Sequence, residues 1–176
     1  GFFCVAGVKH RCPAGTIGNR SGLNSSVCGG PCPSGHWCAE GSTAATPCAA
    51  GTVGRNESLT HATNCTPTPP GFYSAEGSAK PQPCGGVSLY CPGGSARPLP
   101  VGSSNRSCNG SETTRTAQCP CPSGSFCNAG LAIKCPLGFF CVAGVKHPCP
   151  AGTIGNRSGL NSSVCGGPCP SGHWCA

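Results

Sequence analysis

The sequence predicts a string of small disulfide-rich modules, built of loops and short β-hairpins, with almost no helix and no large core. Three features of composition lead to this fold class. The chain of 176 residues holds 19 cysteines, which is the density of a disulfide scaffold. It also holds 29 glycines and 19 prolines, which interrupt helices and strands. Leu, Ile, Val and Phe are too few to bury a core that offsets the entropy lost when the chain is ordered.

An internal repeat sets the organisation of the chain. Residues 1–39 recur at residues 138–176 with 38 of 39 positions identical, and the one change is from Arg11 to Pro148. The period is therefore 137 residues. Identity this close indicates a window on a long tandem array, in which the modules follow one another as an elongated rod.

Shorter units lie inside the period. The clearest unit has four cysteines, Cys32, Cys38, Cys48 and Cys65, which we label positions a, b, c and d. An aromatic residue precedes position b in each unit and a glycine follows b three residues later. The aromatic positions are Phe3, Trp37, Tyr73, Tyr90, Phe126, Phe140 and Trp174. Each is expected either to pack on its own disulfide as a miniature core or to face outward and mediate lateral contacts.

The units divide the chain into seven segments. The segment 1–31 is incomplete at its N-terminal side, 68–83 has Thr68 and Ser74 in place of positions a and b, 84–120 is distorted, and 121–134 is short. The segment 135–168 repeats 1–31. The full set of segments is 1–31, 32–67, 68–83, 84–120, 121–134, 135–168 and 169–176.

Two pairings of neighbouring cysteines use all 14 that one period contains. If a pairs with b and c with d, the loss of a and b in segment 68–83 removes a whole bridge and strands no thiol. The shifted pairing would join Cys38 to Cys48 and would need a bridge from Cys119 to Cys121, a three-residue ring that strains disulfide geometry. The sequence favours the first pairing and leaves the second as the alternative. The favoured bridges are Cys12–Cys28, Cys32–Cys38, Cys48–Cys65, Cys84–Cys91, Cys108–Cys119, Cys121–Cys127, Cys135–Cys141, Cys149–Cys165 and Cys169–Cys175.

The pattern Cys-Pro-x-Gly-aromatic-Cys, followed by Cys-x-x-Gly-Thr-x-Gly, resembles the ephrin-receptor-like cysteine-rich repeat. That short module occurs in receptor ectodomains and, in long arrays, in surface proteins of protists and algae. The resemblance covers nearly the whole chain. It implies an extracellular structural or adhesive role and brings no catalytic residues.

Asparagine carries the strongest functional signal. Six of the seven asparagines in one period are followed at the second position by Ser or Thr, which is the acceptor pattern for N-linked glycans. Most of them fall between positions c and d. In addition, the linker 66–70 (Thr-Pro-Thr-Pro-Pro) is a candidate for O-linked sugar. The candidate N-glycosylation sites are Asn19, Asn24, Asn56, Asn64, Asn105, Asn109, Asn156 and Asn161.

The distribution of charge and the residue types present argue against several classes of function. The net charge is +7, but the basic residues are scattered, which argues against nucleic-acid binding and leaves an acidic polysaccharide as a charged partner. No cysteines have the Cys-x-x-Cys spacing of zinc sites. The chain lacks Asp and shows no nucleophile motif or paired carboxylates. We therefore expect no enzyme, no metal and no cofactor, and the chain has no apolar run that could span a membrane.

These features together predict the protein backbone of a glycosylated extracellular fibre or cell-surface hair. Its expected partners are other copies of itself or sister fibre proteins, and flagellar hairs (mastigonemes) of protists and algae are the analogy. The alternative is an adhesive or receptor-type ectodomain that binds a protein or polysaccharide. Such an ectodomain should vary its exposed residues between copies, whereas a fibre should keep them, as residues 1–39 and 138–176 do.

Overall fold

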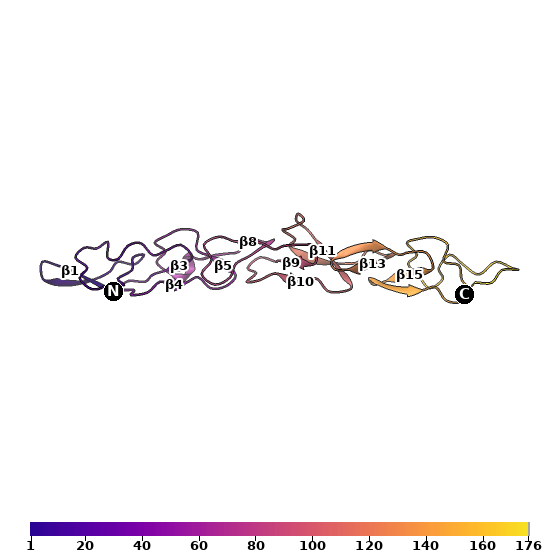
Figure 1. Ribbon diagram of the computed structural model, residues 1–176, viewed down its shortest axis with the longest axis horizontal. Helices are drawn as coiled ribbons and strands as arrows, with labels where there is room; N and C mark the ends of the chain where they lie inside the picture. The colour runs from indigo at the N-terminus through magenta and orange to yellow at the C-terminus, as the bar shows by residue number, and fades with distance from the viewer. Residues whose placement is uncertain (176) are drawn as a thin grey trace. The chain divides into compact units, whose positions relative to one another are not determined.

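The computed structural model describes residues 1–175, and within them short antiparallel hairpins follow one another along the chain (Figure 1). Each pair of strands is adjacent in sequence. The only helix among these residues is a single 3-10 turn, η1 (Ala62–Asn64). The pairs are β1 (Phe2–Val5) with β2 (Val8–Arg11), β3 (His36–Trp37) with β4 (Thr46–Pro47), β5 (Thr52–Val53) with β6 (Thr66–Pro67), β7 (Phe72–Tyr73) with β8 (Gln82–Pro83), β9 (Leu89–Tyr90) with β10 (Leu99–Pro100), β11 (Asn105–Cys108) with β12 (Ala117–Pro120), β13 (Ser125–Asn128) with β14 (Leu131–Lys134), and β15 (Phe139–Val142) with β16 (Val145–Pro148).

Two further hairpins are closed by single bridges, between Thr16 and Pro31 and between Thr153 and Pro168. We number the hairpins 1 to 10 in chain order: residues 2–11, 16–31, 36–47, 52–67, 72–83, 89–100, 105–120, 125–134, 139–148 and 153–168. The fold class predicted from composition is confirmed: the chain forms small disulfide-rich modules with short hairpins, almost no helix and no large core.

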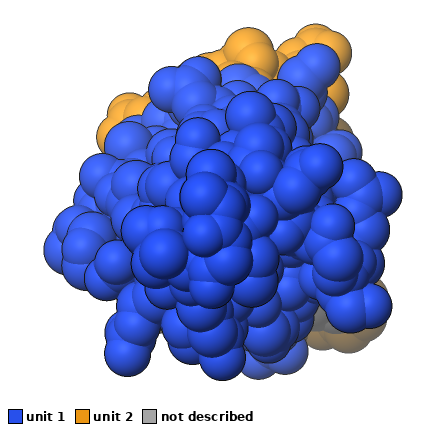
Figure 2. Space-filling model, turned by 90° about the vertical axis from the view of Figure 1, so that its left-hand side faces the viewer, with its two compact units in different colours: residues 1–84, 91–98 blue, residues 85–90, 99–176 orange. Residues whose placement is uncertain are grey.

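The hairpins belong to two compact units, which Figure 2 colours separately. Residues 1–84 and 91–98 form the first unit, and residues 85–90 and 99 onward form the second. Hairpins 1 to 5 therefore lie in the first unit and hairpins 7 to 10 in the second. The strands of hairpin 6 belong to the second unit, whereas the loop that joins them belongs to the first.

A tight turn containing glycine introduces most of the hairpins. Before hairpin 3, the His36 N–H donates to the Pro33 carbonyl at 3.2 Å, and Gly35 between them has φ +82°. A β-turn with positive φ at its third residue favours glycine because a Cβ is disfavoured in that region. The same bond and a glycine of similar φ precede hairpins 2, 4, 5, 8, 9 and 10.

Backbone hydrogen bonds join each hairpin to the next. Between hairpins 3 and 4, the Cys38 N–H donates to the Leu59 carbonyl at 2.9 Å, and the Ser58 N–H donates to the Cys32 carbonyl at 2.8 Å. Hairpins 9 and 10 repeat both bonds, from Cys141 to Leu160 at 2.9 Å and from Gly159 to Cys135 at 2.7 Å. Each hairpin therefore depends mainly on its immediate neighbours, as in other repeat proteins.

Sulfur takes the place of a hydrophobic core. Apart from half-cystines, the buried apolar side chains among residues 1–175 are Leu23, Val53 and Leu160. Burial of an aliphatic side chain contributes only about 1.5–3 kcal/mol. Three such residues cannot offset the ordering entropy of a chain this long, so the disulfides must supply most of the constraint.

The two halves of each predicted four-cysteine unit are versions of one hairpin. The turn before hairpin 3 begins at Cys32, which bonds Cys38, whereas the turn before hairpin 4 begins at Cys48, and Gly54 stands where Cys38 stands in hairpin 3. A Cβ added to Gly54 would lie 2.9 Å from the Cys48 Sγ and 3.0 Å from the Gly35 Cα. Glycine there leaves room for the sulfur of the longer bridge, which ends at Cys65.

Hairpin 5 lacks the shorter disulfide but keeps the two residues at its positions buried. Thr68 and Ser74 occupy the two cysteine positions and are 1% and 0% exposed. Their hydroxyl oxygens are buried and make no hydrogen bond within the protein. In the bridged hairpins, the corresponding Cα atoms lie 5.7–5.9 Å apart, within the range of a disulfide.

We therefore expect the double variant Thr68→Cys with Ser74→Cys to form a tenth bridge and to stabilise the first unit by about 2 kcal/mol, as short loops do in the chain-entropy model. Denaturant unfolding of the oxidised protein, with a thiol count, measures both effects. Either single variant is the control and should gain nothing, because it adds one buried thiol. Two free thiols in the oxidised double variant, beyond that of Cys4, would contradict the prediction.

Candidate functional site

The disulfides pair the positions a–b and c–d. The nine pairs present are those that the sequence favoured, and neither Cys38–Cys48 nor Cys119–Cys121 is among them. Among residues 1–175, Cys4 is the one unpaired cysteine, and it is exposed. Its counterpart one period later, Cys141, is bonded to Cys135.

The candidate glycan acceptors lie mainly on the long hairpin loops. Asn19 and Asn24 lie in the loop of hairpin 2, Asn56 and Asn64 in that of hairpin 4, and Asn156 and Asn161 in that of hairpin 10; Asn109 follows β11. All seven are exposed. Asn105 differs because it lies in β11, opposite Pro120, and is half-buried.

The acceptor side chains differ in how they are held. The Asn64 Oδ1 accepts hydrogen bonds from the Thr60 N–H at 3.2 Å, the His61 N–H at 2.9 Å and the Thr60 hydroxyl at 3.1 Å. The next residue, Cys65, is buried in a disulfide. Asn161 donates from Nδ2 to the Ser123 hydroxyl at 3.2 Å. Asn64, whose amide oxygen accepts three hydrogen bonds, and Asn105, which is half-buried in a strand, are therefore the most constrained acceptors.

The aromatic residues that precede position b are mostly half-buried. Phe3, Trp37, Tyr73, Tyr90, Phe126 and Phe140 are half-buried. Phe3 stacks on His10, and Phe140 stacks on His147, each with ring centroids 5.3 Å apart. Trp174 is 88% exposed, whereas its counterpart Trp37 is half-buried and pairs through its backbone with Leu59 of the following hairpin in a single parallel β-bridge. The aromatics thus contribute partial burial beside the disulfides.

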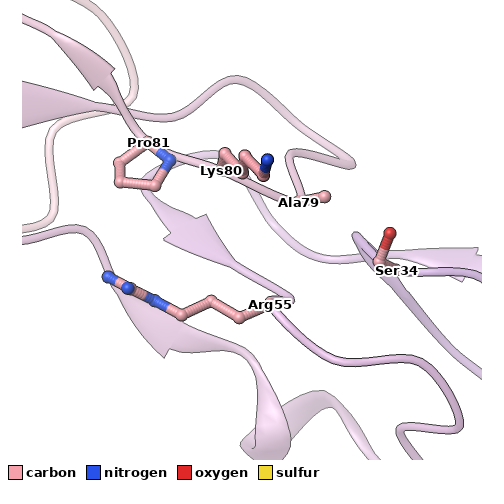
Figure 3. Close-up of a pocket in the computed structure, with 5 residues that line it drawn as sticks. All are labelled: Ser34, Arg55, Ala79, Lys80 and Pro81. Atoms are coloured by element: carbon pink, nitrogen blue, oxygen red, sulfur yellow. The ribbon is translucent and has the colours of Figure 1, made fainter.

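A basic hollow lies in the first unit, where sequence reasoning expected only scattered charge. Its volume is about 460 Å³, and it is lined by Ser34, Arg55, Ala79, Lys80 and Pro81. Figure 3 shows Arg55 on one side and Pro81 and Lys80 on the other. The lining residues come from the turn before hairpin 3 and from hairpins 4 and 5, so no local sequence motif indicates the hollow.

Neither a metal-binding cluster nor a membrane-spanning helix is found in the part of the chain that the structure describes. Residues 1–175 contain no group of three or more His, Cys, Asp or Glu side chains placed to hold a metal ion. Over the same residues, no helix has the length and apolar character needed to cross a membrane.

Comparison with known proteins assigns no family. No protein-family model matches the chain, and no curated protein matches it. The likeness to ephrin-receptor-like repeats therefore rests on the spacing of cysteines, glycines and aromatics alone.

Proposed function

We propose that this chain is a segment of the protein backbone of a glycosylated extracellular fibre or surface hair of the mastigoneme type. The main supporting observation is that hairpins 9 and 10 repeat hairpins 1 and 2 in structure as well as in sequence. Hairpins 1 and 9 share one strand register, Phe3 opposite His10 and Phe140 opposite His147. The bridges Cys12–Cys28 and Cys149–Cys165 have the same span and the same Cα separation of 6.0 Å.

The linkage between hairpins supports an extended array. A unit that bonds only to its neighbours through backbone groups can be repeated without limit and without requiring a larger core. Disulfides persist in oxidising surroundings, and this density of bridges is typical of extracellular proteins. The resemblance to ephrin-receptor-like repeats agrees with that setting and remains part of the proposal.

Electron microscopy of the native assembly tests the fibre role. Negatively stained filaments should show a regular axial repeat, because each 137-residue period would place identical surfaces at equal intervals. A population of isolated flexible monomers, with no axial repeat at any concentration, would instead favour the ectodomain.

Occupied glycan acceptors would coat the loops and keep the assembly hydrated. We expect enzymatic release of N-glycans to lower the mass of the native protein and to convert the exposed acceptors to Asp. The variant Asn56→Gln should lose one glycan. The matched control Asn128→Gln, at an exposed asparagine without Ser or Thr two residues later, should lose none. An unchanged mass after treatment would remove the sugar coat from the proposal.

The basic hollow favours adhesion as a second function. It gives the one complete period of this chain a concave cationic surface, which suits the adhesive alternative with an acidic polysaccharide as partner. The same molecule can serve in both ways if the fibre presents that surface along its length.

A further inference from the structure

We infer that the hollow between Ser34, Arg55 and Lys80 binds the sulfate or carboxylate group of an acidic saccharide. Two cationic side chains and a hydroxyl line one concave surface, and both cations are exposed. A guanidinium forms bidentate hydrogen bonds to such an anion, and an ammonium adds a second charge. The half-buried Ala79 and Pro81 provide an apolar wall against which the C–H face of a sugar ring can pack.

The cations of the hollow are free to bind a ligand. The nearest carboxylates in sequence are Glu57 and Glu76, and the structure records no ion pair from either to Arg55 or Lys80, nor any other ion pair within residues 1–175. Their charge is therefore not neutralised by direct contact. The volume of about 460 Å³ falls in the usual range of small-molecule sites.

Backbone hydrogen bonds position the three chain segments that form the hollow. The Gly35 N–H donates to the Gly54 carbonyl at 2.7 Å, and the Gly54 N–H donates to the Ser78 carbonyl at 3.0 Å. Ser34, Arg55 and Ala79 are the immediate chain neighbours of these three residues. The hydrogen bonds thus hold three hairpins in register at the hollow, which lowers the ordering cost of binding.

The same backbone frame recurs in the first unit with different side chains. One recurrence joins Gly1, Gly18 and Ser42, with Asn19 and Ala44 at the positions of Arg55 and Lys80. A second joins Gly51, Ser74 and Ser95, with Ala75 and Arg97 at those positions, and a third joins Gly15, Cys38 and Leu59, with Ala39 and His61 there. Both cations together occur only in the frame at hairpins 3 to 5, so the charge pair is a property of this place and not of the repeat.

Two double variants with equal net charge test the inference. Arg55→Gln with Lys80→Gln empties the hollow of charge, and Arg20→Gln with Arg97→Gln removes two exposed cations elsewhere. The probe is a heparin oligosaccharide, titrated calorimetrically at fixed salt, with neutral dextran for comparison. We expect the first variant to lose roughly tenfold or more in affinity and the second to lose about twofold, as a change in net charge alone would cause. Equal losses in the two variants would overturn the site.

A second readout separates the site from a folding defect. The probe should protect Lys80 from an amine-reactive label and leave Lys134, in the second unit, fully labelled. Equal labelling of both lysines with and without the probe would also overturn the inference. Both variants should retain the single free thiol of the parent protein.

The acidic saccharide has two possible sources, and Asn56, the residue after Arg55, distinguishes them. If the glycan on Asn56 supplies the anion, the variant Asn56→Gln should bind the heparin probe more tightly, because the hollow is vacated. If a separate polysaccharide supplies it, the affinity should not change. This inference goes beyond the proposed fibre role, and its failure would leave the axial repeat seen by microscopy unaffected.

Discussion

Reduction and alkylation of the disulfides is expected to unfold the whole chain at room temperature without denaturant. Ordering costs about 1–2 kcal/mol per residue in backbone entropy. The described chain offers three buried aliphatic side chains outside the half-cystines, whereas each bridge with a loop of about 15 residues contributes roughly 3 kcal/mol. Circular dichroism, protease resistance and hydrodynamic radius should all change to the values of a disordered chain.

The control is the same protein alkylated without reduction, which should react once, at Cys4, and keep its structure. A reduced and alkylated chain that retained protease resistance would show that the disulfides are not what keeps the chain folded.

Removal of one disulfide tests how far along the chain its stabilising effect extends. Cys48→Ala with Cys65→Ala should speed amide exchange in hairpins 3 to 5 and leave hairpins 8 to 10 unchanged, because neighbouring hairpins carry the coupling.

The pairing of cysteines was accessible from the sequence because the repeat contains its own comparison. Segment 68–83 replaces positions a and b together, and the structure buries both substitutes, Thr68 and Ser74, where a bridge lies in hairpin 3. A sequence with one copy of the unit would have left the two pairings equal. Comparison between the repeated segments therefore selects one disulfide pairing, which the spacing of cysteines in a single unit does not.

The hairpin as the true structural repeat was missed, although a signal for it was present. Both Cys32 and Cys48 begin a Cys-x-x-Gly turn, ending at Gly35 and Gly51, and each turn leads into a hairpin. The cysteine positions do not show this equivalence because Gly54 takes the place of a cysteine in the second hairpin. The glycine pattern, compared half-unit against half-unit, would have revealed it.

The contacts between hairpins and the basic hollow lay beyond sequence reasoning. The bonds that join hairpins run between backbone N–H and C=O groups, which all residues carry apart from the N–H that proline lacks, so they leave no signature in residue type. Arg55 and Lys80 belong to different hairpins. They line the same hollow because those backbone bonds hold the hairpins side by side. The composition indicates a surplus of positive charge, but it does not show that two of the cations line one hollow.

The substitution Gly35→Ala should destabilise the first unit by about 3 kcal/mol or more, through strain at positive φ and steric overlap. Gly35 has φ +82°, and an added Cβ would lie 2.1 Å from the Gly77 carbonyl oxygen and 3.3 Å from the Ala79 nitrogen. Because backbone atoms form that contact, no side chain can move aside to relieve it. Amide exchange at Cys48, whose N–H bonds the Gly35 carbonyl, measures the loss directly.

The matched control is Gly94→Ala, which separates strain from overlap. Gly94 has φ +76°, close to that of Gly35, but an added Cβ would meet nothing within 4 Å. It should therefore cost about 1 kcal/mol, the penalty of an alanine in the left-handed region. Equal effects of the two substitutions would mean that hairpins 3 and 5 are not held against each other at Gly35. The hydrogen bonds from Gly35 to Gly54 and from Gly54 to Ser78, which run through hairpin 4, would then not bring hairpins 3 and 5 into contact.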